Sequence, residues 1–105
     1  MIYKKINNTD LTVSAVSLGT DVYGTDLSVS DSEMLLDFYT EMGGNIIDTA
    51  KIYADWANDE KSQSEKLIGK WLKKKNNRHN LIISTKGGHP NLDTMNISRL
   101  SHDEL

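Results

Sequence analysis

The chain has 105 residues, a net charge of −3 and no cysteine. That length fits one ordinary domain, and 37% hydrophobic with 26% charged residues is typical of a polar globular chain rather than a disordered one. The acidic balance argues against nucleic acid binding, and the missing cysteine excludes disulfide and thiol chemistry. No apolar run approaches the length of a membrane span or a signal peptide, so a cytoplasmic chain without a membrane partner is expected.

Short β-prone stretches open the chain at residues 3–6 and 11–13. The segment between them is rich in Asn and Asp, which favour turns, so the two stretches predict an N-terminal hairpin. Residues 15–18 then predict a strand that ends at Gly19 and Thr20.

Three capping boxes, each a serine followed three residues later by a glutamate, predict helix starts at Ser30, Ser62 and Ser101. Apolar residues recur at helical spacing behind the first two boxes. They are Met34, Leu35, Phe38, Tyr39 and Met42 in the first helix, and Leu67, Ile68, Trp71 and Leu72 in the second. The glycines at 43–44 and the asparagines at 76–77 are expected to end these helices.

Apolar runs of strand length follow the hairpin region at residues 45–49 and 81–86. Helices between such strands predict an α/β fold with a parallel sheet. The strand ends at Gly19, Thr49 and Lys86 lie 30 and 37 residues apart, about one β/α unit each. A (β/α)₈ TIM barrel has about 31 residues per unit. The chain is therefore expected to be one domain that holds the hairpin and about three units of the barrel, incomplete at the C-terminus.

Polar residues gather where the predicted strands end, at Gly19, Thr20, Asp48 and Lys86. In a parallel sheet with right-handed crossovers these ends share one face, where barrel enzymes place their active sites. Asp48 and Lys86 have strand positions that point both side chains into the same interior, which predicts an ion pair. Taken singly, each is better explained as a surface cap on its strand, and only the agreement of the three strand ends favours a site.

Tyr53 lies in the loop five residues after Asp48. One interpretation is a tyrosine that packs over the barrel mouth. The other is a general acid, since an ordinary tyrosine has a pKa of about 10 and a nearby cation favours the ionised phenol. A lysine ammonium about 4 Å away contributes on the order of 4 kcal/mol at an effective dielectric of 20. The phenol could then protonate a carbonyl oxygen.

Three motifs together resemble the aldo-keto reductase family: Asp-Thr-Ala at 48–50 with Tyr53, Ser-Glu-Lys-Leu-Ile-Gly at 64–69, and Ser-Thr-Lys-Gly at 84–87. The strand at 16–20 after a hairpin is similar to the family's first strand. The resemblance implies an NAD(P)H-dependent enzyme that reduces an aldehyde or ketone. Hydride passes to the carbonyl carbon while a tyrosine protonates the oxygen.

By this resemblance Tyr53 is the acid/base, Lys86 makes its phenol a stronger acid, and Asp48 pairs with the lysine. Gly19, Thr20 and Asp48 match positions that line the nicotinamide end of the cofactor, with NADP(H) expected first and NAD(H) second. A small carbonyl or sugar-like substrate is implied. No residue is assigned to a metal.

The family's fourth catalytic residue is a histidine at the end of the fourth strand, and His79, His89 and His102 do not occupy that place. The 105-residue chain is therefore expected to be only part of the active enzyme, inactive and poorly stable alone. One alternative is a non-catalytic truncated barrel that acts as an interaction or regulatory module, with self-association through its open edge. Another is a small α/β fold that binds a ligand at a switch point.

Overall fold

The protein is described by a computed structural model that covers residues 1–104. Its elements in chain order are β1 (Tyr3–Lys5), β2 (Thr12–Ser14), β3 (Leu18–Gly19), α1 (Val29–Glu41), β4 (Ile46–Asp48), α2 (Gln63–Lys75), the short 3₁₀ helix η1 (Arg78–Asn80) and β5 (Ile82–Ser84). The antiparallel β1–β2 pair confirms the predicted hairpin. Neither α1 nor α2 in this part of the chain is long and apolar enough to cross a membrane.

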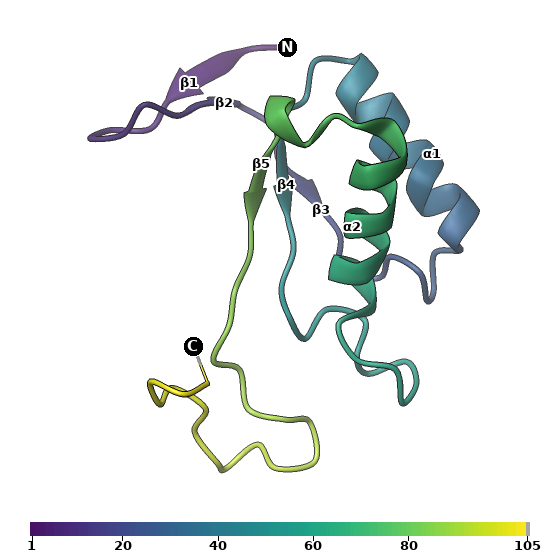
Figure 1. Cartoon of the computed structure of the whole chain (residues 1–105), viewed down its shortest axis with the longest axis vertical. Helices are drawn as coiled ribbons and strands as arrows, with labels where there is room; N and C mark the ends of the chain where they lie inside the picture. The colour runs from purple at the N-terminus through teal and green to yellow at the C-terminus, as the bar shows by residue number, and fades with distance from the viewer. Residues whose placement is uncertain (105) are drawn as a thin grey trace.

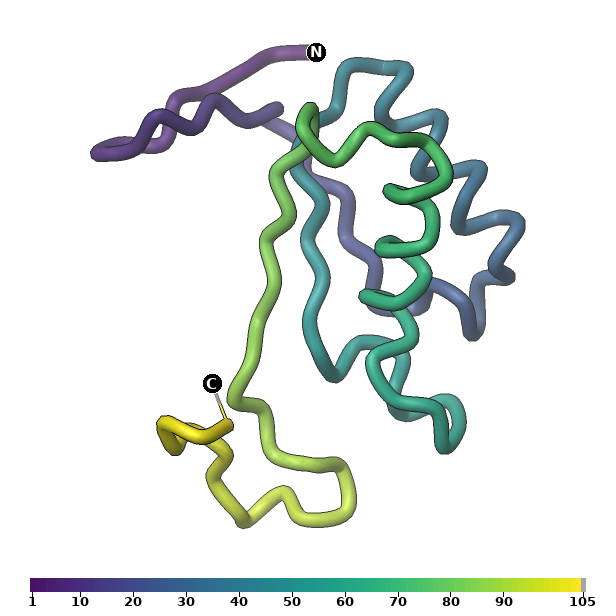
Figure 2. Tube along the Cα trace, viewed as in Figure 1, coloured from purple at the N-terminus to yellow at the C-terminus, as the bar shows by residue number. Residues whose placement is uncertain are grey.

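The other strands form a parallel sheet in the order β3-β4-β5, which confirms the predicted α/β fold. In register, Leu18 of β3 lies opposite Ile47 of β4, and Ile47 lies opposite Ile83 of β5. Both long helices lie on the same side of these strands (Figure 1). Beyond β5 the chain continues past the strand ends and turns back on itself (Figure 2).

The core lies between the sheet and the two helices. Its buried members are Tyr23, Leu36, Tyr39, Ile47, Leu67, Ile68, Trp71 and Leu81. Trp71 is fully buried, and its indole N–H donates to the Asp37 carboxylate of α1 at 2.9 Å. Lys75 pairs with the same carboxylate at 2.8 Å and, with the Trp71 bond, holds the pKa of Asp37 below its usual value. These contacts fasten α2 to α1, and the predicted apolar face of α2 is confirmed.

The helix start predicted at Ser62 is confirmed, since Ser62 is the N-cap of α2, but neither predicted capping box forms its hydrogen bonds. At α1 the cap is Ser28 instead of Ser30, since the Ser28 hydroxyl accepts from the Asp31 amide at 3.1 Å. At α2 the backbone of Ser62 is left-handed, with φ of 56°, and its side chain makes no capping bond. At α1, Ser28 and Ser30 carry the same hydroxyl group two residues apart, so the spacing to a glutamate did not identify which of them is the cap.

The predicted helix start at Ser101 is also different in the structure. The Ser101 hydroxyl donates to the Glu104 carboxylate at 3.1 Å, whereas in a capping box each of these side chains accepts from a backbone N–H. Residues 101–104 form a turn rather than a helix.

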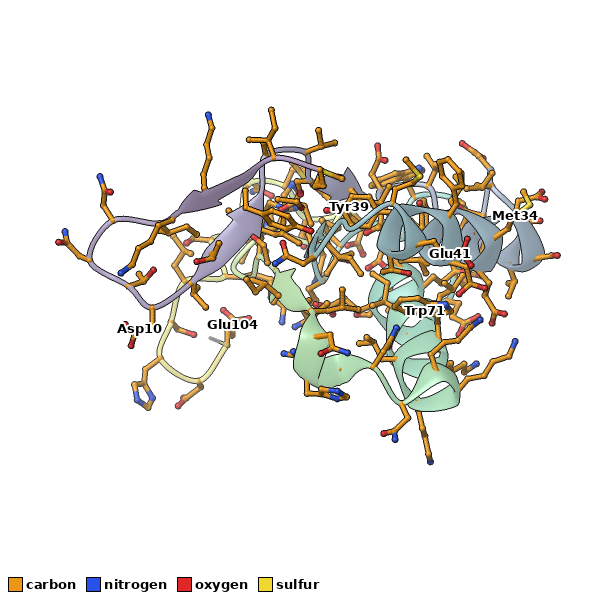
Figure 3. All side chains as sticks on the ribbon, turned by 90° about the horizontal axis from the view of Figure 1, so that it is seen from above. Asp10, Met34, Tyr39, Glu41, Trp71 and Glu104 are labelled. Carbon is orange, nitrogen blue, oxygen red and sulfur yellow. The ribbon has the colours of Figure 1, made fainter. Side chains whose placement is uncertain are left out.

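The predicted apolar face of α1 is largely on the outside of the molecule. Met34 and Phe38 are each 60% exposed and Met42 is 58% exposed, whereas Leu36 is fully buried. Figure 3 shows Met34 directed away from the strands and Trp71 lying between the helices. Only Tyr39 of the predicted face is buried, because the helix turns that side chain toward the strands.

The strand predicted at residues 15–18 is shorter and later, because β3 spans only Leu18–Gly19. The carbonyl of Val16 accepts from the Tyr39 hydroxyl and from the Ser14 hydroxyl, both at 2.8 Å. The Tyr39 hydroxyl also lies 2.8 Å from the carbonyl of Ile46. The Val16 carbonyl is therefore bonded to the hydroxyls of Ser14 and Tyr39, where the predicted strand would have a backbone bond to β4.

Gly44 lies against the ring of Tyr39 so closely that a Cβ at this position would overlap the ring. The ring cannot move away easily, since its hydroxyl bonds to the segments on both sides. We expect Gly44→Ala to destabilise the chain by about 1–3 kcal/mol, measured as the shift of the urea unfolding midpoint.

Gly69 is the matched control for this substitution. It lies in α2 with open space around the position of a Cβ. Gly69→Ala is expected to stabilise the chain by about 0.5–1 kcal/mol through helix propensity. Equal midpoints for the two variants would contradict the close packing at Gly44.

Candidate active site

The ends of β4 and β5 bring Asp48 and Lys86 together. Asp48 lies opposite Ser84 in the parallel register, and Lys86 follows Ser84 by two residues on the same side of the strand. The Lys86 ammonium donates to both carboxylate oxygens of Asp48 at 2.8 Å and to the carbonyl of Thr49 at 2.9 Å. The ion pair predicted from strand alternation is present in the structure.

Tyr53 completes the cluster from the loop after β4. Its hydroxyl lies 3.2 Å from the Lys86 ammonium, which also lies 4.7 Å from the centroid of the ring. The loop is held by a bond from the Tyr53 amide to the carbonyl of Ala50 at 3.1 Å. Ala54 then adopts a left-handed backbone, with φ of 68°, and is fully buried. The buried Ala54 therefore anchors the loop one residue beyond Tyr53.

The charge on Lys86 is stabilised by its neighbours. Partial burial opposes the charge, but the hydrogen bonds with Asp48 and Tyr53 outweigh it and raise the pKa of Lys86 above its usual value. The lysine side chain is 50% exposed, so the pair contributes at most about 1 kcal/mol to folding. This contribution is complete below the ordinary lysine pKa and is lost as the pH rises through the raised pKa.

Gly19 and Thr20 lie on opposite sides of the end of β3. Gly19 is exposed, lies opposite Asp48 in register, and has nothing within 4 Å of the position of a Cβ. Thr20 has no exposed surface, and its hydroxyl donates to the carbonyl of Asp48 at 2.9 Å. The placement of Gly19 leaves room for a flat ring beside Asp48. Thr20 holds the strand end in this way, and its predicted contact with the cofactor stays a prediction.

Sequence reasoning missed the hydrogen bonds that the start of α2 makes to the strand ends. The Ser64 hydroxyl lies 3.1 Å from that of Thr49, and the Thr85 hydroxyl donates to the Glu65 carboxylate at 2.6 Å. The sequence placed Glu65 in the capping box at Ser62, and Ser64 only in the family motif at 64–69. Strand alternation was the signal that could have found these bonds, since neighbours of Asp48 and Lys86 must face the helices.

The three histidines lie away from this cluster. His79 is exposed in η1, and the side chain of His102 is fully exposed. The Nδ1 atom of His89 lies 2.6 Å from the carbonyl of Pro90. Within residues 1–104, no histidine is hydrogen-bonded to Asp48, Tyr53 or Lys86.

Comparison with known proteins agrees with this geometry. The family model described as "Aldo/keto reductase family" matches residues 15–105. Protein tas of Escherichia coli is 33% identical over 118 residues, an alignment that covers 100% of this chain and 34% of tas. The chain therefore belongs to the aldo-keto reductase family, and the resemblance drawn from its motifs is confirmed.

Solved structures give the same result. The holo form of aldo-keto reductase AKR11C1 from Bacillus halodurans superposes with a TM-score of 0.68 at 28% identity, over 87% of this chain and 28% of that one. PA4992 from Pseudomonas aeruginosa gives a TM-score of 0.70 at 28% identity, over 91% of this chain and 34% of that one. The chain thus spans about a third of the length of its relatives.

Proposed function

We propose that this chain supplies the acid–base groups of an NAD(P)H-dependent enzyme that reduces aldehydes or ketones. The observation that carries the proposal is the position of the Lys86 ammonium, 2.8 Å from both oxygens of Asp48 and 3.2 Å from the Tyr53 hydroxyl. Membership of the aldo-keto reductase family supports this class of reaction. In this proposal residues 1–105 are the N-terminal hairpin and the first units of a (β/α)₈ barrel domain.

Tyr53 is the proton donor in the proposed mechanism. Its hydroxyl protonates the carbonyl oxygen of the substrate and leaves a phenolate beside Lys86. The Lys86 ammonium lies 3.2 Å from the Tyr53 oxygen, so its positive charge attracts the phenolate that this step leaves, and solvent screens the attraction because the lysine side chain is 50% exposed. Asp48 holds the ammonium charged and in place. In this arrangement Asp48 orients Lys86, Lys86 stabilises the phenolate, and Tyr53 is the general acid.

The open side of the cluster fits the nicotinamide end of a cofactor. Gly19 has no side chain there, and Asp48 lies beside it in register, so a flat ring could approach the strand ends closely. When bound, NADPH supplies the hydride that adds to the carbonyl carbon. We propose NADP(H) as the cofactor, with NAD(H) as the second option, and a small carbonyl or sugar-like compound as the substrate.

A chimera tests the proposal, in which residues 1–105 replace the aligned segment of AKR11C1. We expect the folded chimera to oxidise NADPH in the presence of simple aldehydes, measured by the loss of nicotinamide absorbance. Near-UV circular dichroism establishes that the chimera is folded, and an unfolded chimera is remade with tas as the acceptor. A folded chimera that binds NADPH but reduces no aldehyde would contradict the proposal.

The 105-residue chain alone is expected to show no reduction in the same assay. Holding a cofactor against a substrate contributes on the order of 7–11 kcal/mol to lowering a barrier, and three strands offer few surfaces to do so. Aldehyde reduction by the purified 105-residue chain would overturn this expectation. The parental AKR11C1 is the positive control.

A second candidate function is an interaction module, and the exposed apolar residues of α1 favour it. Met34, Phe38 and Met42 are spaced four residues apart and are all more than half exposed. Within residues 1–104, β5 also has a partner strand on one edge only. This candidate predicts a dimer of the 105-residue chain in sedimentation that Phe38→Lys dissociates. A monomer at all concentrations would contradict it.

A further inference from the structure

We infer that Ser64 and Glu65, consecutive residues in the first turn of α2, are positioning residues that support the geometry of Asp48 and Lys86 from the opposite side of the sheet. The catalytic consequence of this inference rests on the function proposed above. The hydrogen bonds and burial from which the inference is argued do not depend on that function.

Strand alternation places the charged residues and their neighbours on opposite sides of the sheet. Asp48 is followed by Thr49, which is 1% exposed and faces the helices. Lys86 is preceded by Thr85, whose hydroxyl points to α2. Each charged residue therefore has a threonine next to it that α2 can hold.

Ser64 holds the ends of β3 and β4. Its fully buried hydroxyl lies 2.7 Å from the carbonyl of Thr20, 2.9 Å from the Thr20 hydroxyl and 3.1 Å from the Thr49 hydroxyl. The Thr20 hydroxyl in turn donates to the carbonyl of Asp48. This network therefore ties the backbone at Asp48 and the side chain of its neighbour to one hydroxyl of α2. Leaving a buried polar group without its partner costs about 1–3 kcal/mol.

Glu65 holds the end of β5. Its carboxylate accepts from the Thr85 hydroxyl at 2.6 Å, a short bond to a charged acceptor and therefore a strong one. Lys86 itself lies beyond the last residue of β5, Ser84. Its carbonyl accepts one bond there, from the amide of Lys51 at 3.0 Å. The Ser84 carbonyl accepts a further backbone bond from the Thr49 amide at 2.8 Å, and the bond to Glu65 adds a side-chain anchor to this end of the strand.

The helix that carries both residues is itself well fixed. Ile68 and Trp71 of α2 are buried in the core, at 2% and 0% exposure. By contrast, the half-exposed pair of Asp48 and Lys86 contributes at most about 1 kcal/mol and does not hold two strand ends at a set distance by itself. The start of α2 therefore adds side-chain tethers to the backbone bonds, Thr49 to Ser84 at 2.8 Å and Lys51 to Lys86 at 3.0 Å, that already join the two strand ends.

The test uses two variants that leave the net charge unchanged, Ser64→Ala and Thr85→Val. In the 105-residue chain, competitive acetylation followed by mass spectrometry reports the reactivity of each lysine across a range of pH. We expect both variants to increase the acetylation of Lys86 by about threefold or more, the change produced by a fall of about half a pKa unit. Thr85→Ser restores the hydroxyl and is expected to return the value of the unmodified chain.

Ser32→Ala is the matched control, because Ser32 is also fully buried and hydrogen-bonded but lies in α1, away from the strand ends. Near-UV circular dichroism of Trp71 reports folding. Thr85 is exposed, so Thr85→Val decides the test if Ser64→Ala does not fold. Folded variants with the same Lys86 reactivity as Ser32→Ala would overturn the inference.

The same substitutions in the chimera separate this inference from the proposed function. If both are correct, kcat falls in Ser64→Ala and Thr85→Val while KM changes little. If the proposed function is wrong, the chimera is inactive but Lys86 reactivity still rises in the two variants. If the inference is wrong, the chimera is active and neither quantity responds.

Discussion

Tyr53→Phe is expected to lower the kcat of aldehyde reduction by the chimera about 10²- to 10⁴-fold. The substitution removes the hydroxyl that lies 3.2 Å from the Lys86 ammonium and leaves no group there to protonate the carbonyl oxygen. Because the ring remains, its contact with the ammonium remains too. Steady-state kinetics with saturating NADPH and a simple aldehyde measure the loss.

Tyr23→Phe is the matched control for this loss. Tyr23 is 3% exposed, and its buried hydroxyl has no hydrogen-bond partner among residues 1–104. Removing such a hydroxyl is expected to leave kcat unchanged and the stability equal or higher. Equal rates for Tyr53→Phe and the unmodified chimera would eliminate Tyr53 as the proton donor.

Trp71→Ala is expected to have the largest effect on stability, a loss of about 3–5 kcal/mol. Trp71 is the largest fully buried side chain, and its indole N–H holds the Asp37 carboxylate of α1. Small domains have a total stability of about 5–15 kcal/mol, so this loss is a large fraction of it and removes much of the folded population at the lower end of that range. Urea unfolding followed by far-UV circular dichroism measures it.

Trp56→Ala is the control, since Trp56 is 48% exposed in the loop before α2. A surface substitution of this kind is expected to change stability by less than about 0.5 kcal/mol. Trp71→Phe keeps most of the buried area but loses the bond to Asp37, so it is expected to lie between the two. A Trp71→Ala chain as stable as Trp56→Ala would show that α2 does not pack as described.

Local patterns in the sequence were sufficient for the order of the elements. Continuous apolar runs predicted β4 and β5, and the spacing of Leu67, Ile68 and Trp71 predicted the buried face of α2. The positions of Asp48 and Lys86 at strand ends also predicted their contact, since alternation in neighbouring parallel strands depends only on residue number. The roles of these residues in catalysis stay a prediction.

The same reasoning failed where the deciding contacts join residues far apart in the chain. The Tyr39 hydroxyl donates to the Val16 carbonyl, and β3 is shorter than predicted. In α1, Leu36 packs into the core, and the methionines therefore face outward. Serine spacing could not choose between Ser28 and Ser30 as the cap of α1.

The sequence by itself determined the family, the order of the strands and the two long helices, and the meeting of Asp48 with Lys86, because each depends on local spacing. Only the tertiary structure decided that Thr20 faces the helices and that the first turn of α2 holds the strand ends. Its bonds from Ser64 to Thr20 and from Thr85 to Glu65 span 44 and 20 residues. Strand alternation indicates which threonines face the helices, but the residue of α2 that bonds to each one is decided only when the sheet and helix have packed.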